Sequence, residues 1–157
     1  FPYTEDFESY ATLQIPLGWT VEDDNNDGKV WKTINNPQQT DIAHSGTGAV
    51  HMAFNFSIAM DDWLFTPPLQ LEGGQTYKLD FWYHVMEAFG TIYPEKLEVK
   101  WGNAPTAAAM TSSQLFNTDN MVNTNYMNSV SEFTPATDGV YYIGFHGYSD
   151  AFTQLSQ

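Results

Sequence analysis

Strict alternation of side-chain character constrains this chain more than any other feature. From residue 77 to 83, one face carries Tyr77, Leu79, Phe81 and Tyr83, and the other carries Lys78, Asp80 and Trp82, followed by His84. A period of two residues is typical of a half-buried β-strand, because successive side chains point to opposite faces. The same alternation recurs in 96–101 and 140–146.

Turn-forming clusters separate these segments from shorter strand candidates. We expect short strands over 19–22, 30–34, 49–54 and 63–65, with turns at 24–28, 45–48, 72–74 and 138–139. Short strands at this spacing, without a sustained helical period, favour an all-β antiparallel sandwich or barrel. A short helical turn is predicted near 104–110, and the polar segment Thr111–Asn128 is predicted to be a long surface loop. No repeat or linker interrupts the chain, so residues 1–157 are expected to form a single domain.

Charge excludes several classes of partner. Five Lys, no Arg and 19 acidic residues give a formal net charge of −14. Such a chain repels phosphate backbones and lacks the side chain that reads them best, so no nucleic acid is expected as a partner. No apolar stretch approaches the roughly 20 residues that span a bilayer, so membrane insertion is not expected. The chain starts at Phe1 and has no signal segment, so we expect that any targeting segment was removed or left out.

The sharpest local motif is Asp23-Asp24-Asn25-Asn26-Asp27-Gly28, which fits the calcium-loop pattern D-x-N-x-D-G. An EF-hand is rejected because Ile34 occupies the position of the bidentate Glu. The motif also suits a simple hairpin turn, since Asp, Asn and Gly all favour turns. Both interpretations stay open on the residues alone.

Other candidate chemistry is weaker. The acidic run Glu5-Asp6-Phe7-Glu8 suits either oxygen ligation of a hard cation or a charged sheet edge. The four histidines lack zinc-ligand spacing, and the chain has no Cys, so a structural or exposed role is favoured for them. No catalytic motif or cofactor fingerprint is present, and we expect no enzymatic activity. Among 25 aromatic residues, Trp101 and Tyr148 are candidates for stacking on a sugar or anchoring a protein.

The order of these segments resembles the cleaved-adhesin group, close to the choice-of-anchor J domains of Bacteroidetes surface and secreted proteins. The resemblance covers about residues 1–150. It rests on Y-T-E-D-F-E-S at 3–9, L-G-W-T-V at 17–21, D-N-N-D-G-K-V-W at 24–31, A-H-S-G-T-G-A at 43–49, D-D-W-L-F-T-P-P-L at 61–69, Y-K-L-D-F-W-Y at 77–83, F-T-P-A at 133–136 and G-V-Y-Y-I-G-F-H at 139–146.

The resemblance implies an antiparallel jelly-roll β-sandwich that holds structural calcium and serves adhesion or ligand binding. Carried over to this chain, the cation ligands would be the Glu8 side chain and the loop of Ser45, Gly46 and Gly48. Asp24 and Asp27 would form a second locus, and Asp62 would have a structural role at the start of a strand.

The chain departs from the family at its end. The usual last strand carries an acidic pair, whereas this chain ends Ser149-Asp150-Ala151-Phe152-Thr153-Gln154-Leu155-Ser156-Gln157. A divergent or missing final strand would weaken the cation site and leave an open sheet edge. Strand exchange or edge-to-edge pairing with a second chain is therefore a further hypothesis.

The resemblance favours a secreted or surface-displayed module that recognises a host or microbial glycan or protein. The alternatives are a structural spacer in a larger surface protein and, less favoured, a glycan hydrolase that uses two facing carboxylates.

Overall fold

A computed structural model describes residues 2–39 and 41–152 of the chain. The molecule is an antiparallel β-sandwich. Its larger sheet has the strand order β1 (Thr20–Asp23), β4 (Asp62–Phe65), β10 (Gly139–Gly147), β7 (Glu95–Gly102) and β8 (Phe116–Met121), and β5 (Leu69–Leu71) pairs with the start of β10. The all-β antiparallel jelly-roll class expected from the sequence is confirmed.

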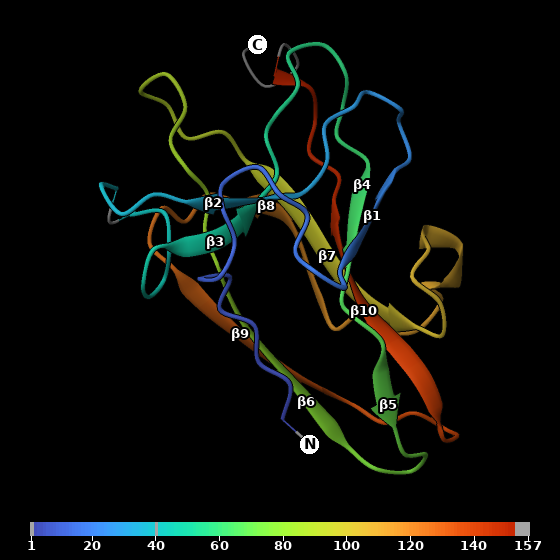
Figure 1. The fold of residues 1–157 in the computed structure, drawn as a ribbon. Helices are drawn as coiled ribbons and strands as arrows, with labels where there is room; N and C mark the ends of the chain where they lie inside the picture. Colours follow the sequence, from blue (N-terminus) through green and yellow to red (C-terminus); the bar gives the residue numbers. More distant parts are fainter. Residues whose placement is uncertain (1, 40, 153–157) are drawn as a thin grey trace.

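Two shorter ladders form the second layer, which faces the larger sheet in Figure 1. Strand β6 (Tyr77–Tyr83) pairs along its whole length with β9 (Met127–Phe133), and β2 (Lys32–Asn35) pairs with β3 (Gly48–His51). The inner side chains of the β6–β9 ladder pack against β7 and β10, which makes the space between these strands the main core.

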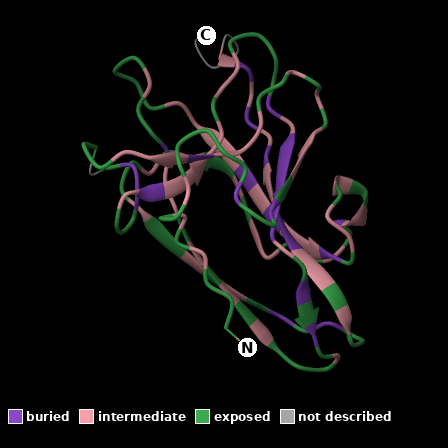
Figure 2. Ribbon diagram, in the orientation of Figure 1, coloured by how far each residue is buried: buried purple, intermediate pink, exposed green. Residues whose placement is uncertain are grey.

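That core follows from the alternation. Leu97 and Val99 of β7 and Ile143 of β10 are buried, and Leu79 and Phe81 of β6 pack against them from the opposite layer. Strand β4 is buried throughout (Figure 2) because both of its faces are covered. Its outer residues Trp63 and Phe65 pack with Met110, which follows the 3₁₀ turn η1 (Ala107–Ala109).

Most strand predictions are confirmed, and β6 has the predicted bounds. The long loop predicted over Thr111–Asn128 is wrong, because β8 lies within it and β9 begins at Met127. Strand β8 reads F-N-T-D-N-M and lies at the edge of the larger sheet, so its solvent-facing residues are polar and hide the β-pattern. Strand β5 was not predicted, since three residues between turns carry too little pattern.

The helical turn predicted near 104–110 is present only as η1. The divergent end of the chain lies partly outside the described residues, at 153–157. In the part that is described, no helix has both the length and the apolar character needed to cross a bilayer.

Replacing Phe65 with alanine tests whether the outer face of β4 is a true second core. The side chain is fully buried and stacks on Trp63 with ring centroids 5.8 Å apart. Because the substitution leaves a large cavity, we expect Phe65→Ala to lower the free energy of unfolding by about 3–5 kcal/mol. Urea denaturation measures this loss. Val122→Ala, in an exposed loop, is the control and should change it by less than about 0.5 kcal/mol.

Candidate functional site

Three carboxylates meet where β1 and β4 lie side by side. Asp23 ends β1 and is paired directly with Asp62, the first residue of β4. The turn after β1 brings Asp27 back, because the Asp23 carboxylate accepts the backbone N–H groups of Asp27 (3.1 Å) and Gly28 (2.9 Å). One oxygen from each of Asp23, Asp27 and Asp62 lies within 4.8 Å of the others.

Asp62 distinguishes this group from an ordinary acidic turn. Its side chain is fully buried, and its Oδ1 accepts no hydrogen bond from any described residue. Its Oδ2 accepts only a long contact, 3.4 Å, from the backbone N–H of Asp61. Burial raises the pKa of Asp62 to about 7, and the charges of Asp23, Asp27 and Asp61 add to the rise. A buried carboxylate oxygen with no donor is costly unless a cation neutralises it.

The donor set fits calcium. Calcium takes oxygen ligands at about 2.3–2.6 Å, so two oxygens bound to the same ion lie no more than about 5 Å apart. The three carboxylates satisfy that limit. Asn55 donates a 2.6 Å hydrogen bond to Asp27 Oδ2, which fixes the third carboxylate in place. These residues would hold the ion, and its positive charge would offset their mutual repulsion.

Asp24, which the sequence placed at this locus together with Asp27, lies outside the group of three. Its side chain is exposed, and burial together with the neighbouring charges of Glu22 and Asp61 raises its pKa. Its backbone N–H donates a 3.0 Å hydrogen bond to Asp61 O, which extends the β1–β4 ladder by one residue. The D-x-N-x-D-G pattern therefore contributes its first and fifth positions to the cluster, Asp23 and Asp27.

The other predicted cation locus is closed by direct hydrogen bonds. Glu8 Oε1 accepts the backbone N–H groups of Thr47 (2.8 Å) and Gly48 (2.7 Å), and Oε2 accepts the Thr47 hydroxyl. These backbone bonds lower the pKa of Glu8. Gly46 has φ +68°, and a Cβ there would collide with the Glu8 carboxylate.

The loop beginning at Ser45 thus packs closely against Glu8 and donates hydrogen bonds to its carboxylate. Gly48 also allows close approach, since a Cβ on it would lie 2.5 Å from Phe7 O. The donors presented to Glu8 are N–H and O–H groups, so the contact between Glu8 and the loop needs no bridging cation. Calcium ligation by Glu8, Ser45, Gly46 and Gly48 stays a prediction.

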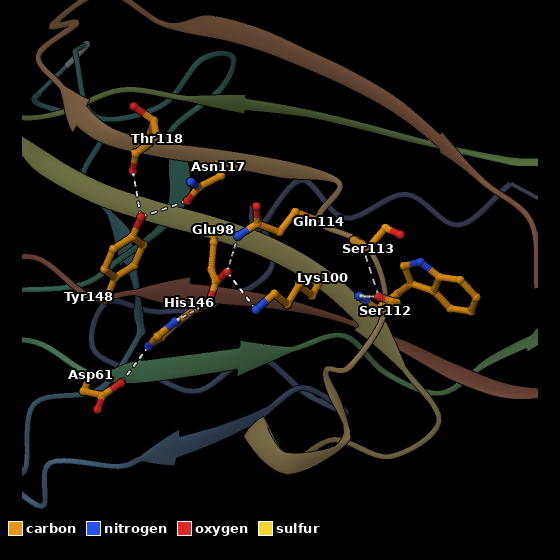
Figure 3. Close-up of polar contacts among 11 residues, drawn as sticks. Asp61, Glu98, Lys100, Ser112, Ser113, Gln114, Asn117, Thr118, His146 and Tyr148 are labelled. Carbon is orange, nitrogen blue, oxygen red and sulfur yellow. Dashed lines mark hydrogen bonds and ion pairs between the residues drawn. The ribbon is translucent and has the colours of Figure 1, made fainter.

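A polar network covers the outer face of β7 and β10 (Figure 3). His146 lies between two carboxylates, with Nδ1 2.9 Å from Glu98 Oε1 and Nε2 2.7 Å from Asp61 Oδ1. Its ring also stacks on Trp63 with centroids 4.2 Å apart and planes only 3° from parallel. Each ring nitrogen therefore faces a carboxylate oxygen, and a neutral imidazole, which has one N–H, can donate to only one of the two.

Glu98 is the centre of this network. Its carboxylate also receives Lys100 Nζ at 2.9 Å and Gln114 Nε2 at 2.8 Å. Burial tends to raise the pKa of Glu98, but the bonds from His146, Lys100 and Gln114 prevail and leave it lowered. Both oxygens of this carboxylate have partners, with His146 at Oε1 and with Lys100 and Gln114 at Oε2, so the network is a structural feature of the sheet face.

The two predicted ligand-contacting aromatics have different surroundings. Trp101 lies on the inner face of β7, with its ring 5.1 Å from that of Phe133 and 5.4 Å from that of Tyr141. Tyr148 lies just beyond β10 at the surface, and its hydroxyl donates to Asn117 Oδ1 at 2.8 Å (Figure 3). Both residues are half-buried, and a ligand-binding role for either one stays a prediction.

The sequence did not predict the surroundings of Asp62 and Trp82. Asp62 was expected to be structural, and no local pattern shows that β-pairing would place it opposite Asp23. Trp82 was placed on the polar face of its strand, where it is 48% exposed. A large aromatic residue among polar side chains on the outer face of a strand is the feature of the sequence that could have indicated a binding role for Trp82.

Replacing Glu98 with glutamine tests the network. Glu98→Gln removes the charge that His146 and Lys100 share, so we expect a loss of about 1–3 kcal/mol in unfolding free energy at neutral pH. Because the folded-state pKa of Glu98 is lowered, its stabilising contribution is complete above the ordinary glutamate pKa and is lost as pH falls below about 4. Thermal melts from pH 7 to pH 3 should therefore show the two proteins converging in acid. A constant gap would contradict this assignment.

Comparisons with known proteins place the fold. The family described as "Cleaved Adhesin Domain" matches residues 3–144. Three solved domains of Lys-gingipain are similar in structure. The K1 domain from Porphyromonas gingivalis W83 has a TM-score of 0.70 and 22% identity, and the match covers 93% of this chain and 87% of that one. The K2 domain has a TM-score of 0.66 at 20% identity, covering 94% and 90% of the two chains.

The K3 domain from Porphyromonas gingivalis W83 has a TM-score of 0.59 at 20% identity, covering 90% of this chain and 91% of that one. At these identities the three structures support the fold. No curated protein matches the sequence. The family match spans most of the chain and confirms the resemblance drawn from its motifs. The chain therefore belongs to the Cleaved Adhesin Domain family.

Proposed function

We propose that this chain is a non-catalytic adhesion module that recognises a glycan or a protein and is stabilised by a structural calcium ion. The observation that carries the adhesion role is the family match over residues 3–144. We place the module at a cell surface or in a secreted protein, the setting that the family resemblance implies. The net charge of −14 disfavours nucleic acid as the ligand.

Two pockets of the described residues lack the side chains that glycoside hydrolysis needs. One pocket is lined by Trp101, Gly102, Asn103, Ala109, Thr111, Ser112 and Tyr141, and another by Leu13, Gly28, Lys29, Val30, Lys32, His51 and Ala53. Neither lining includes a carboxylate side chain. Hydrolysis of a glycoside needs two carboxyl groups across the scissile bond, so these pockets do not supply that chemistry.

The calcium proposal rests on Asp62. Its buried Oδ1 has no hydrogen-bond donor in the described part of the chain and lies in a group with two further carboxylates. An ion there would connect the end of β1, the turn that follows it and the start of β4. Calcium would thus stabilise one end of the sandwich and does not need to contact a ligand.

Calcium should raise the melting temperature of the protein, and Asp62→Asn should remove that response. At 100 times its dissociation constant, an ion that binds only the folded state contributes about 2.7 kcal/mol. Without calcium, Asp62→Asn should melt at or above the wild-type temperature, because it removes a buried charge beside Asp23 and Asp27. Differential scanning calorimetry with calcium, and again with a chelator, measures both effects.

Two matched variants locate the ion. Asp24→Asn changes an adjacent carboxylate outside the group of three and should keep the full calcium response. Glu8→Gln changes the other candidate locus and should also keep it. If Glu8→Gln removes the response and Asp62→Asn does not, calcium binds at the Glu8 loop and the Asp23–Asp27–Asp62 assignment is wrong.

The adhesion role is tested by offering the labelled chain to arrays of glycans and of extracellular proteins. We expect selective binding to one class, and no change in a bound glycan when it is incubated with the protein and analysed by chromatography. Cleavage of the glycan would show an enzyme. Absence of binding on both arrays would favour the spacer alternative.

A further inference from the structure

The outward face of the β6–β9 ladder carries a row of four rings. Trp82 stacks on His44, with ring centroids 3.8 Å apart and planes 13° from parallel. Tyr126 meets His44 edge-on at 5.5 Å and stacks on His84 at 4.1 Å. We call Trp82, His44, Tyr126 and His84 the aromatic row.

The row is held rigidly from beneath. The Tyr126 hydroxyl donates to the carbonyl of Ile42, a residue that is 2% exposed, at 2.5 Å. His84 Nδ1 lies 3.2 Å from Thr124 O. Trp82 itself is fixed on β6, opposite Asn128 of β9. A ring that is already ordered loses little entropy when a ligand stacks on it.

Trp82 offers an open face. One side of its indole is covered by His44, yet 48% of the residue is exposed, so the remaining exposure is the opposite side and the ring edge. Its Nε1–H donates to no acceptor among the described residues. The residue thus presents a flat π-surface next to a free hydrogen-bond donor.

Acceptors lie beside this surface. Asn128 uses both of its amide hydrogens, for Asp80 Oδ1 at 2.7 Å and for Phe81 O at 3.2 Å, which leaves its Oδ1 free among the described residues. Asp80 is oriented by that bond and by Lys78 Nζ at 3.3 Å. The neighbourhood of Trp82 therefore combines one free N–H with amide and carboxylate oxygens.

We propose that Trp82, with Asp80 and Asn128 beside it, binds a neutral pyranose ring of a glycan. The C–H groups on the flat side of such a ring fit the electron-rich indole face, and its hydroxyls both donate and accept. They can therefore serve Asp80 and Asn128 as well as the Trp82 N–H. This inference rests on the proposed function and assigns a ligand class and a surface to it.

Other occupants fit less well. A Lys or Arg side chain could stack on Trp82, but it has no acceptor for the indole N–H. Acidic sugars are disfavoured by the net charge of −14. A stable protein interface buries about 800 Å² per partner around an apolar centre. On the outward face of the ladder the exposed apolar side chains are Trp82 and Val130, interspersed with Lys78, Asp80, Asn128 and Glu132.

Nuclear magnetic resonance of the ¹⁵N-labelled full chain tests this site. The five Trp residues give five indole N–H signals, and Trp82→Phe identifies the one that belongs to Trp82. The probes are cellotetraose, chitotetraose, mannotetraose and maltotetraose at millimolar concentration, with sialyllactose and a tetra-arginine peptide for comparison. We expect at least one neutral tetrasaccharide to shift the Trp82 signal saturably while the other four signals stay in place.

Variants then separate the ring from its surroundings. Trp82→Ala should weaken binding of that tetrasaccharide about tenfold or more, followed through the backbone amide signals of β9. His44→Ala should weaken it less, because the indole remains but loses its support. Phe56→Ala, an exposed aromatic residue on the β3–β4 loop, is the matched control and should leave binding unchanged.

Several results would overturn the assignment. One is that no neutral tetrasaccharide shifts the Trp82 signal. Another is that only the peptide or sialyllactose shifts it. A third is that a folded Trp82→Ala protein binds the sugar as the unchanged chain does. If the arrays reveal a ligand that Trp82→Ala still binds, this site is wrong and the proposed function stands. If a bound glycan is cleaved, the proposed function fails whatever the Trp82 signal does.

Discussion

The antiparallel pairing of β10 with β4 and β7 is the interaction on which the rest of this structure depends. One strand of nine residues bonds to both neighbours, and its first part also pairs with β5. Because side chains alternate, the same strand delivers Ile143 and Phe145 to the core and His146 to the outer face. The register thereby sets His146 against Glu98 of β7 and Trp63 of β4. The inner core and the outer network are thus two consequences of one ladder.

Individual carboxylates of this acidic protein are stabilised by their own hydrogen bonds and ion pairs. Glu8 is stabilised by backbone N–H groups and Glu98 by bonds from His146, Lys100 and Gln114, and both carboxyl groups have lowered pKa values. Asp62 follows neither pattern, since it is buried beside two like charges and its Oδ1 has no hydrogen-bond partner among the described residues. Among the described residues, Asp62 is the buried carboxylate with an oxygen left without a partner, and the calcium proposal rests on this exception.

Sequence patterns predicted what depends on local order. The alternation at 77–83 gave a strand with the bounds that the structure shows, and the motif at 23–28 gave a turn rich in oxygen ligands. Strand β8 was not predicted because an edge strand needs few apolar residues. The roles proposed for Asp62 and Trp82 were not predicted for a different reason. Their surroundings depend on pairing across the chain, with Asp23 and Asn128 respectively, and on a loop that brings His44 to Trp82.

The two proposed sites lie on different layers. Asp23 and Asp62 belong to β1 and β4 of the larger sheet, whereas Trp82 belongs to the β6–β9 ladder of the opposite layer. No carboxylate of the acidic group is among the residues that flank Trp82. Calcium would therefore influence glycan binding only through the stability of the sandwich. Under conditions in which the calcium-free protein is folded, its affinity for a neutral sugar should equal that of the calcium-bound protein. This separation distinguishes a structural ion from one that ligates the sugar directly.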